Sequence, residues 1–98
     1  MKPGEDIIVN GLRDLESGRE TVSALLVLIG APRLRNIGHN VPITTIANPE
    51  HQLYLMLQAE DADSAHSRYN AWIRRLVSYE RAAERELSES ENYLQGSN

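Results

Sequence analysis

Four side chains near the middle of the chain have the chemistry to bind a metal ion. Glu60, Asp61, Asp63 and His66 combine hard carboxylates with one imidazole, a set that can bind a divalent cation. Asp61 and Asp63 also stand at the start of a predicted helix, where aspartate commonly caps the first turn. We therefore interpret them as helix caps and predict no metal site and no cofactor. The chain has no cysteine, which excludes a thiolate zinc site, a disulfide framework and a cysteine nucleophile.

Arginine dominates the basic residues, and it is unevenly distributed. Lys2 is the only lysine, and two stretches without acids, 21–49 and 64–79, together hold Arg33, Arg35, Arg68, Arg74 and Arg75. If these stretches meet, the arginines form a basic patch that could bind nucleic-acid phosphates or an acidic partner. Alternatively, their stems cover apolar surface and their guanidinium groups pair with acids. We favour the second interpretation, because the net charge of −4 works against nucleic-acid binding without excluding a local site.

The segment Arg33-Leu34-Arg35-Asn36-Ile37-Gly38-His39 resembles the ribonuclease motif of HEPN domains, which are helical bundles of about this size. That motif has an Arg and a His a few residues apart. The resemblance implies that Arg33 or Arg35 would act with His39 to orient an RNA 2′-hydroxyl and stabilise the scissile phosphate. The match covers seven residues and departs from the pattern, since Leu34 replaces the usual polar residue and Gly38 breaks the helix. We therefore assign no catalytic residue and keep an RNA-cleaving enzyme as the less favoured alternative.

Large apolar and aromatic side chains recur every three or four positions towards the end of the chain. Tyr69, Trp72, Leu76 and Tyr79 follow this spacing, which is a heptad-like seam on one helix face. Such rings either form the core of the chain or an interface, where Trp, Tyr and Arg are enriched. In a small chain both can hold. The predicted contact residues are Tyr54, Tyr69, Trp72, Arg75, Leu76 and Tyr79.

Charged residues of both signs follow this seam. Arg81 and Glu84 are three residues apart and could pair on one helix face. Glu80 with Glu84, and Arg81 with Arg85, are like-charged pairs four residues apart. We interpret this segment as an ordinary solvated helix end.

Glycine and proline divide the chain into helical pieces that must position these side chains. The segment 22–29 is apolar on every side, which predicts a central, buried helix, although its β-branched residues would also suit a buried strand. Asn48-Pro49-Glu50 combines a preferred N-cap, a proline suited to the first helical position and an acid in the first turn. The expected helices span about 5–16, 20–30, 33–37, 49–59 and 62–88, and we expect 39–47 to be an ordered loop.

Length and composition fit one small folded domain. The chain has 98 residues, of which 41% are hydrophobic and 24% charged. Its longest apolar run is too short to span a bilayer, and its first residues do not read as a signal peptide. Without cysteine, we expect a cytoplasmic protein, and compactness with arginine bias suggests a bacterial one. We expect a domain at 1–88 and a flexible polar tail at 89–98.

These observations predict an all-α bundle of four to five helices, with the second helix central and the long last helix packed across it. Because a domain of this size buries a limited share of its surface, self-association is expected. We therefore predict a non-enzymatic module that forms a homodimer or docks onto a larger protein. A nucleic-acid-binding protein is the alternative, and no membrane contact is expected.

Overall fold

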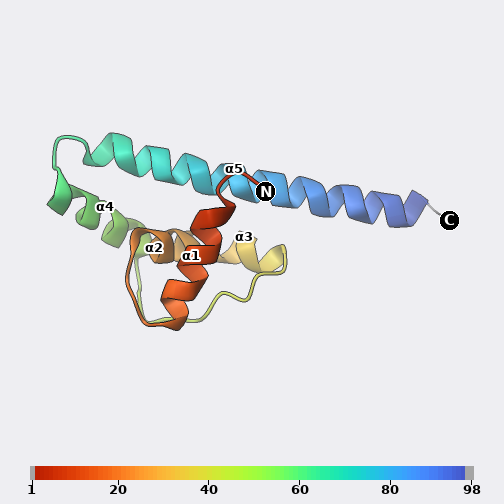
Figure 1. Cartoon of the computed structure of the whole chain (residues 1–98), viewed down its shortest axis with the longest axis horizontal. Helices are drawn as coiled ribbons and strands as arrows, with labels where there is room; N and C mark the ends of the chain where they lie inside the picture. The colour runs from red at the N-terminus through yellow and green to blue at the C-terminus, as the bar shows by residue number, and fades with distance from the viewer. Residues whose placement is uncertain (1, 97–98) are drawn as a thin grey trace.

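The computed structural model describes the backbone of residues 2–96 and the side chains of residues 2–91. It consists of five α-helices: α1 Glu5–Glu16, α2 Val22–Ile29, α3 Ala31–Asn36, α4 Pro49–Glu60 and α5 Ala65–Gly96 (Figure 1). The described residues contain no strand. The predicted all-α class and the number of helices are therefore confirmed, and the segment 39–47 is a loop.

Helix α2 lies at the centre of the molecule. Ala24, Leu25, Leu26 and Val27 are completely buried, and α2 packs against each of the other four helices. Thr21 caps its first turn by accepting a hydrogen bond from the backbone N–H of Ala24 at 3.1 Å. The apolar composition of this segment thus corresponds to a buried helix, as predicted, and not to a strand.

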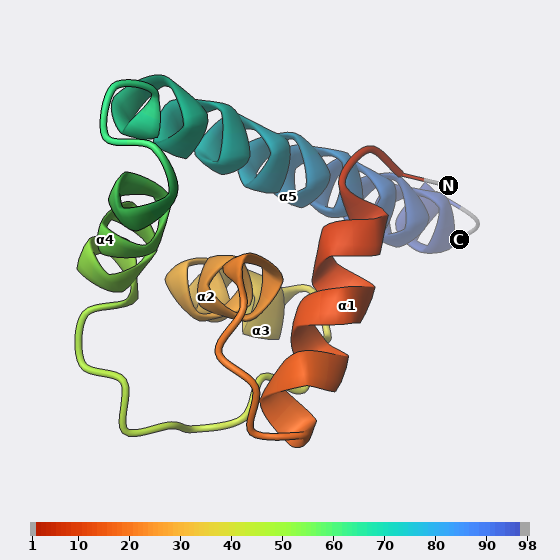
Figure 2. The ribbon, with the colours of Figure 1, turned by 60° about the vertical axis from the view of Figure 1, so that its left-hand side comes forward.

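Helices α1 and α4 flank α2 on two sides (Figure 2). Helix α1 buries Ile7, Ile8 and Gly11, and the glycine lets the backbones of α1 and α2 approach closely because a Cβ there would collide with the Ser23 carbonyl. Helix α4 begins as the sequence predicts, with the Asn48 side chain accepting from an N–H of the first turn and proline next to it.

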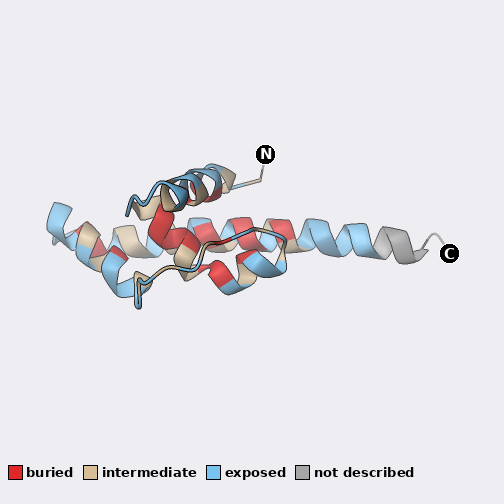
Figure 3. Ribbon diagram, turned by 90° about the horizontal axis from the view of Figure 1, so that it is seen from below, coloured by how far each residue is buried: buried red, intermediate tan, exposed pale blue. Residues whose placement is uncertain are grey.

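Helix α5 lies across the other helices (Figures 1 and 2). Buried residues of α5 concentrate in its middle, and residues 85–91 are all exposed (Figure 3). The helix begins at Ala65, after a turn in which Asp61 accepts hydrogen bonds from the Asp63 N–H and the Ser64 hydroxyl. Its backbone stays helical to Gly96, past the predicted end at residue 88.

The division into a domain at 1–88 and a tail at 89–98 stays a prediction. The side chains of 92–98 and the backbone of 97–98 lie outside the described residues.

Candidate functional sites along α5

An ion-pair cluster joins α3 to the middle of α5. The guanidinium group of Arg33 lies 3.1 Å from Glu80 Oε1. It also donates two hydrogen bonds to the Glu84 carboxylate, at 2.6 and 3.1 Å. Arg33 reaches both acids because one α-helical turn separates them on α5. We call these three residues the Arg33 cluster.

Glu80 is the buried member of the Arg33 cluster. It is 2% exposed, and its Oε2 has no hydrogen-bond partner among the described residues. Burial raises the pKa of Glu80, an effect that the charge of Arg33 partly offsets. By contrast, the hydrogen bonds from Arg33 lower the pKa of Glu84. Gly30, at the junction of α2 and α3, makes room for this carboxylate, since a Cβ there would lie 2.8 Å from Glu80 Oε2.

A second polar contact ties the loop after α3 to α5. His39 Nε2 lies 2.6 Å from the Tyr79 hydroxyl, and burial raises the pKa of that phenol. An open hollow of about 340 Å³ lies beside this pair. Ile37, Ala83 and Leu87 contribute apolar lining, and charged side chains of the N-terminal segment and α5 lie at the same hollow. These charged groups are Lys2 and Glu86, whose Nζ and Oε2 atoms are 2.9 Å apart.

The six predicted contact residues divide into two groups. Leu76 and Tyr79 are buried, with exposed fractions of 3% and 4%, and belong to the core of the chain. The other four, Tyr54, Tyr69, Trp72 and Arg75, are not fully buried.

The partly exposed aromatic rings are ordered by neighbouring side chains. Tyr54 of α4 meets Tyr69 of α5 edge to face, with ring centroids 5.9 Å apart. The Arg75 guanidinium lies 5.0 Å from the Trp72 ring centroid and 3.6 Å from Asp6 Oδ2. These contacts join α5 to α4 and α1, so they stabilise the bundle as well as contributing to its surface.

Four of the five predicted patch arginines are engaged within the chain. Arg33 belongs to the cluster described above, and Arg68 pairs with Glu60 at 2.7 Å. Arg35 donates to the Val41 carbonyl at 2.9 Å, Arg75 contacts α1, and Arg74 is exposed. The contact points of Arg33 and Arg68 on α5 are also separated by about 24 Å, given 1.5 Å per residue from position 68 to 84. Their charges are therefore spread along the helix.

The three residues that resemble the ribonuclease motif have separate partners. Arg33 faces α5 acids, Arg35 binds a loop carbonyl, and His39 contacts a tyrosine. Arg33 holds the short helix α3 against α5, and His39 holds the loop after α3 against α5. Arg35 holds the same loop against α3. No hydrogen bond joins either arginine to His39 among the described side chains.

Two features of α5 differ from what its sequence spacing alone indicates. Arg81 makes no ion pair with Glu84, because Glu84 is taken by Arg33 of α3. Arg81 and Arg85 are exposed and share a helix face with Arg74, as their spacing of four and seven residues could have indicated. The second feature is Leu87, which follows the seam spacing, as the sequence indicates, but is 42% exposed where Leu76 and Tyr79 are buried.

Comparison with protein-family models, with curated proteins and with solved structures found no match for this chain. Within residues 2–96, no helix is long and apolar enough to cross a membrane. Among the side chains of residues 2–91, no group of three or more His, Asp or Glu is placed to hold a metal ion.

Proposed function

We propose that the protein is a non-enzymatic interaction module that binds another protein chain through α5, in the first instance a second copy of itself. The observation that carries this proposal is the apolar seam of α5. The rest of the chain buries this seam as far as Ala83 and leaves its next apolar residue, Leu87, exposed. Tyr79 and Ala83 are 4% and 9% exposed, whereas Leu87, one turn further on the same face, is 42% exposed.

The surroundings of Leu87 support a protein partner. It borders the open hollow whose lining includes Ile37 and Ala83, so an apolar side chain of a partner could pack there. The described residues 85–91 are all exposed, so this end of α5 gains little stability from packing within the chain. A bound chain would supply the missing contacts.

A second copy is the first partner to test. Small domains gain buried surface by association, and two-fold dimers are the commonest protein assemblies. A two-fold arrangement would place Leu87 of each copy in the same interface. A larger protein could occupy the same surface, and it is the second partner to test.

Light scattering during size-exclusion chromatography tests the proposal. Leu87→Asp is the informative variant, and Leu55→Asp on α4 is its matched control because both leucines are 42% exposed. We expect the unmodified chain at twice its 11.0 kDa mass, loss of the dimer in Leu87→Asp, and a dimer in Leu55→Asp. A chain that stays monomeric and retains no protein partner on affinity purification would overturn the proposal.

A further inference from the structure

A row of three arginines follows the outer side of α5, which faces away from the other helices. Arg74, Arg81 and Arg85 are separated by seven and four residues, so at about 100° per residue they lie within about 40° of one another around the helix. All three are exposed. They span roughly 16 Å along the axis. We call these residues the arginine row.

Most acids of α5 near the row are used elsewhere, and Glu89, four residues after Arg85, is the exposed acid that shares its side of the helix. Glu80 and Glu84 bind Arg33 on the inner side, and Glu86 binds Lys2. Within residues 2–91, none of the three arginines forms an ion pair. The tertiary ion pairs thus draw Glu80, Glu84 and Glu86 to other arginine and lysine side chains, and the outer face keeps three arginines with one acid, Glu89.

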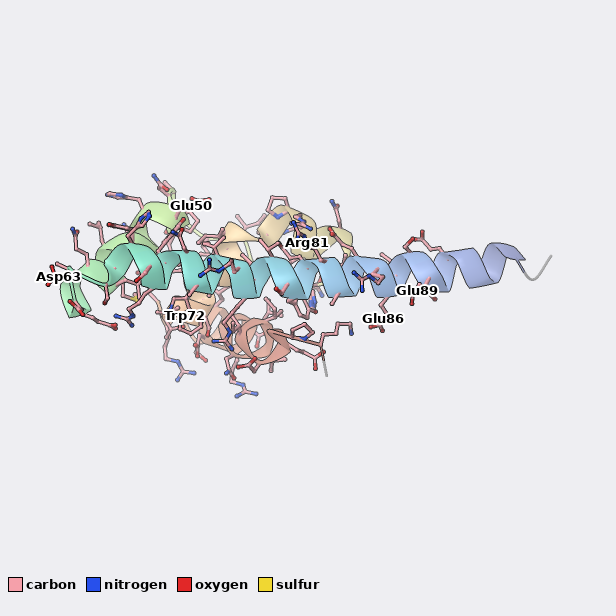
Figure 4. All side chains as sticks on the ribbon, turned by 90° about the horizontal axis from the view of Figure 1, so that it is seen from above. Glu50, Asp63, Trp72, Arg81, Glu86 and Glu89 are labelled. Atoms are coloured by element: carbon pink, nitrogen blue, oxygen red, sulfur yellow. The ribbon has the colours of Figure 1, made fainter. Side chains whose placement is uncertain are left out.

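The outer side of α5 is also sterically open. Helices α1 to α4 all lie on one side of α5, and the segment at Pro3 and Gly4 reaches the flank of α5 beside Arg74 (Figures 1 and 2). When α5 is viewed from its outer side, Trp72 lies at the edge next to α1, and Arg81 lies at the opposite edge (Figure 4). A large ligand could therefore approach the row at Arg81 and Arg85, and at Arg74 from the side away from Pro3 and Gly4.

The composition of this face indicates the class of ligand. The residues beside the arginines are polar, namely Asn70, Ser78, Ser88 and Glu89, and all are exposed. A protein interface needs an apolar or aromatic centre, which this face lacks. Arginine, in contrast, binds phosphate through a planar, bidentate fork.

We propose that the arginine row binds the phosphate backbone of double-stranded DNA, with the outer face of α5 lying along the phosphates at the edge of the major groove. The row is placed there because a face turned into the groove itself would meet base edges instead of phosphates. Because the net charge of −4 opposes long-range attraction, binding is weak and falls steeply with salt.

This inference does not depend on the proposed protein interface. Leu87 is two residues after Arg85, which turns it by about 200° to the other side of the helix. A dimer formed through Leu87 would leave both arginine rows accessible. Leu87→Asp should therefore abolish self-association without removing DNA binding, so failure of one proposal is distinguishable from failure of the other.

The test is fluorescence anisotropy of a mixed-sequence DNA duplex titrated with the full chain at several salt concentrations. Three phosphate contacts predict a slope of log K against log[salt] near −2.7, or about a 40-fold loss of affinity between 50 and 200 mM salt. The variant carrying Arg74→Gln, Arg81→Gln and Arg85→Gln should lose this binding. The matched control removes three charges elsewhere, through Arg13→Gln, Arg19→Gln and Arg68→Gln, and should keep the slope. Thermal melts check that both variants fold.

Three results would overturn the assignment. One is the absence of DNA binding even at low salt. Another is an equal loss of binding in the row variant and in the control variant, which would indicate a general charge effect. The third is row-dependent binding of poly-glutamate with none of DNA, which would identify an acidic protein as the ligand. Loss of DNA binding in the row variant alone supports the proposal.

Discussion

The Arg33 cluster makes the sharpest prediction about stability. Replacing Arg33 with methionine leaves the Glu80 carboxylate 2% exposed and without its positive partner. Removing one member of a buried ion pair costs about 3–5 kcal/mol. Since the Arg33 side chain is 43% exposed, water screens part of the pair, and we expect a loss of about 2–3 kcal/mol. That corresponds to a fall in Tm of roughly 10–20 °C.

A second substitution separates the ion pair from ordinary packing. Glu80→Leu removes the buried charge together with the unpartnered oxygen, and leaves Arg33 its bonds to Glu84. We expect this variant to lie within about 1 kcal/mol of the unmodified chain, because apolar replacement of a buried charge is often neutral. The double variant Arg33→Met, Glu80→Leu should be more stable than Arg33→Met alone, since no charge is left buried and unpaired.

Urea denaturation followed by circular dichroism measures all four members of this cycle. Arg19→Met is the control, because it breaks a surface bridge to Asp14 and should leave the unfolding midpoint almost unchanged. The reasoning is refuted if Arg33→Met is no less stable than Arg19→Met. It is equally refuted if the double variant is as unstable as Arg33→Met.

The same cycle has a defined pH dependence. Burial raises the pKa of Glu80 above its ordinary value of 4.5. The folded state is therefore destabilised as pH rises through the folded-state pKa and Glu80 becomes charged. Below pH 4.5 Glu80 is protonated in both states, and this destabilisation is absent. The hydrogen bonds from Arg33 lower the pKa of Glu84. The pair therefore stabilises the folded chain above pH 4.5, and this stabilisation is lost as pH falls through the folded-state pKa of Glu84. Both effects predict that the stability deficit of Arg33→Met shrinks on acidification. A deficit that grows as pH falls would contradict this assignment.

Three further predictions follow from local contacts. Gly11→Ala should destabilise the chain by about 1–3 kcal/mol in urea titrations, because its Cβ would collide with the Ser23 carbonyl of α2. Asn48→Ala should cost about 0.5–2 kcal/mol by the same assay, since it removes the side-chain cap on the His51 N–H. Spectrophotometric titration should find that the Tyr79 phenol ionises above its ordinary pKa of 10.0, because burial opposes the charged form; ionisation at or below that value would contradict the buried geometry.

Local signals were sufficient to predict most of the elements. The start of α4 follows from Asn48 and Pro49, whose cap geometry depends only on neighbouring residues. The burial of α2 follows from the lack of a polar face over 22–29. These features involve interactions within a few residues, and therefore the sequence specifies them directly.

Partners distant in the sequence were not predictable in the same way. The spacing of Arg81 and Glu84 suggests a local pair, but Glu84 binds Arg33, which is 51 residues away. A tertiary contact thus replaces the local one and leaves Arg81 exposed. Similarly, the seam spacing cannot tell Leu76, which is buried, from Leu87, which is exposed, because the difference depends on where the other helices end.

The length of α5 has a consequence for how the molecule moves in solution. The chain measures 55 × 26 × 21 Å, and its radius of gyration of 15.1 Å exceeds the roughly 13 Å of a compact domain of this size. Such a rod-like particle experiences more friction than a sphere of equal mass, and it tumbles more slowly about its short axes than about its long one. A single chain would therefore elute early from a sizing column calibrated with spherical proteins. It would also show direction-dependent NMR relaxation, with amides along α5 relaxing differently from those of helices that cross it.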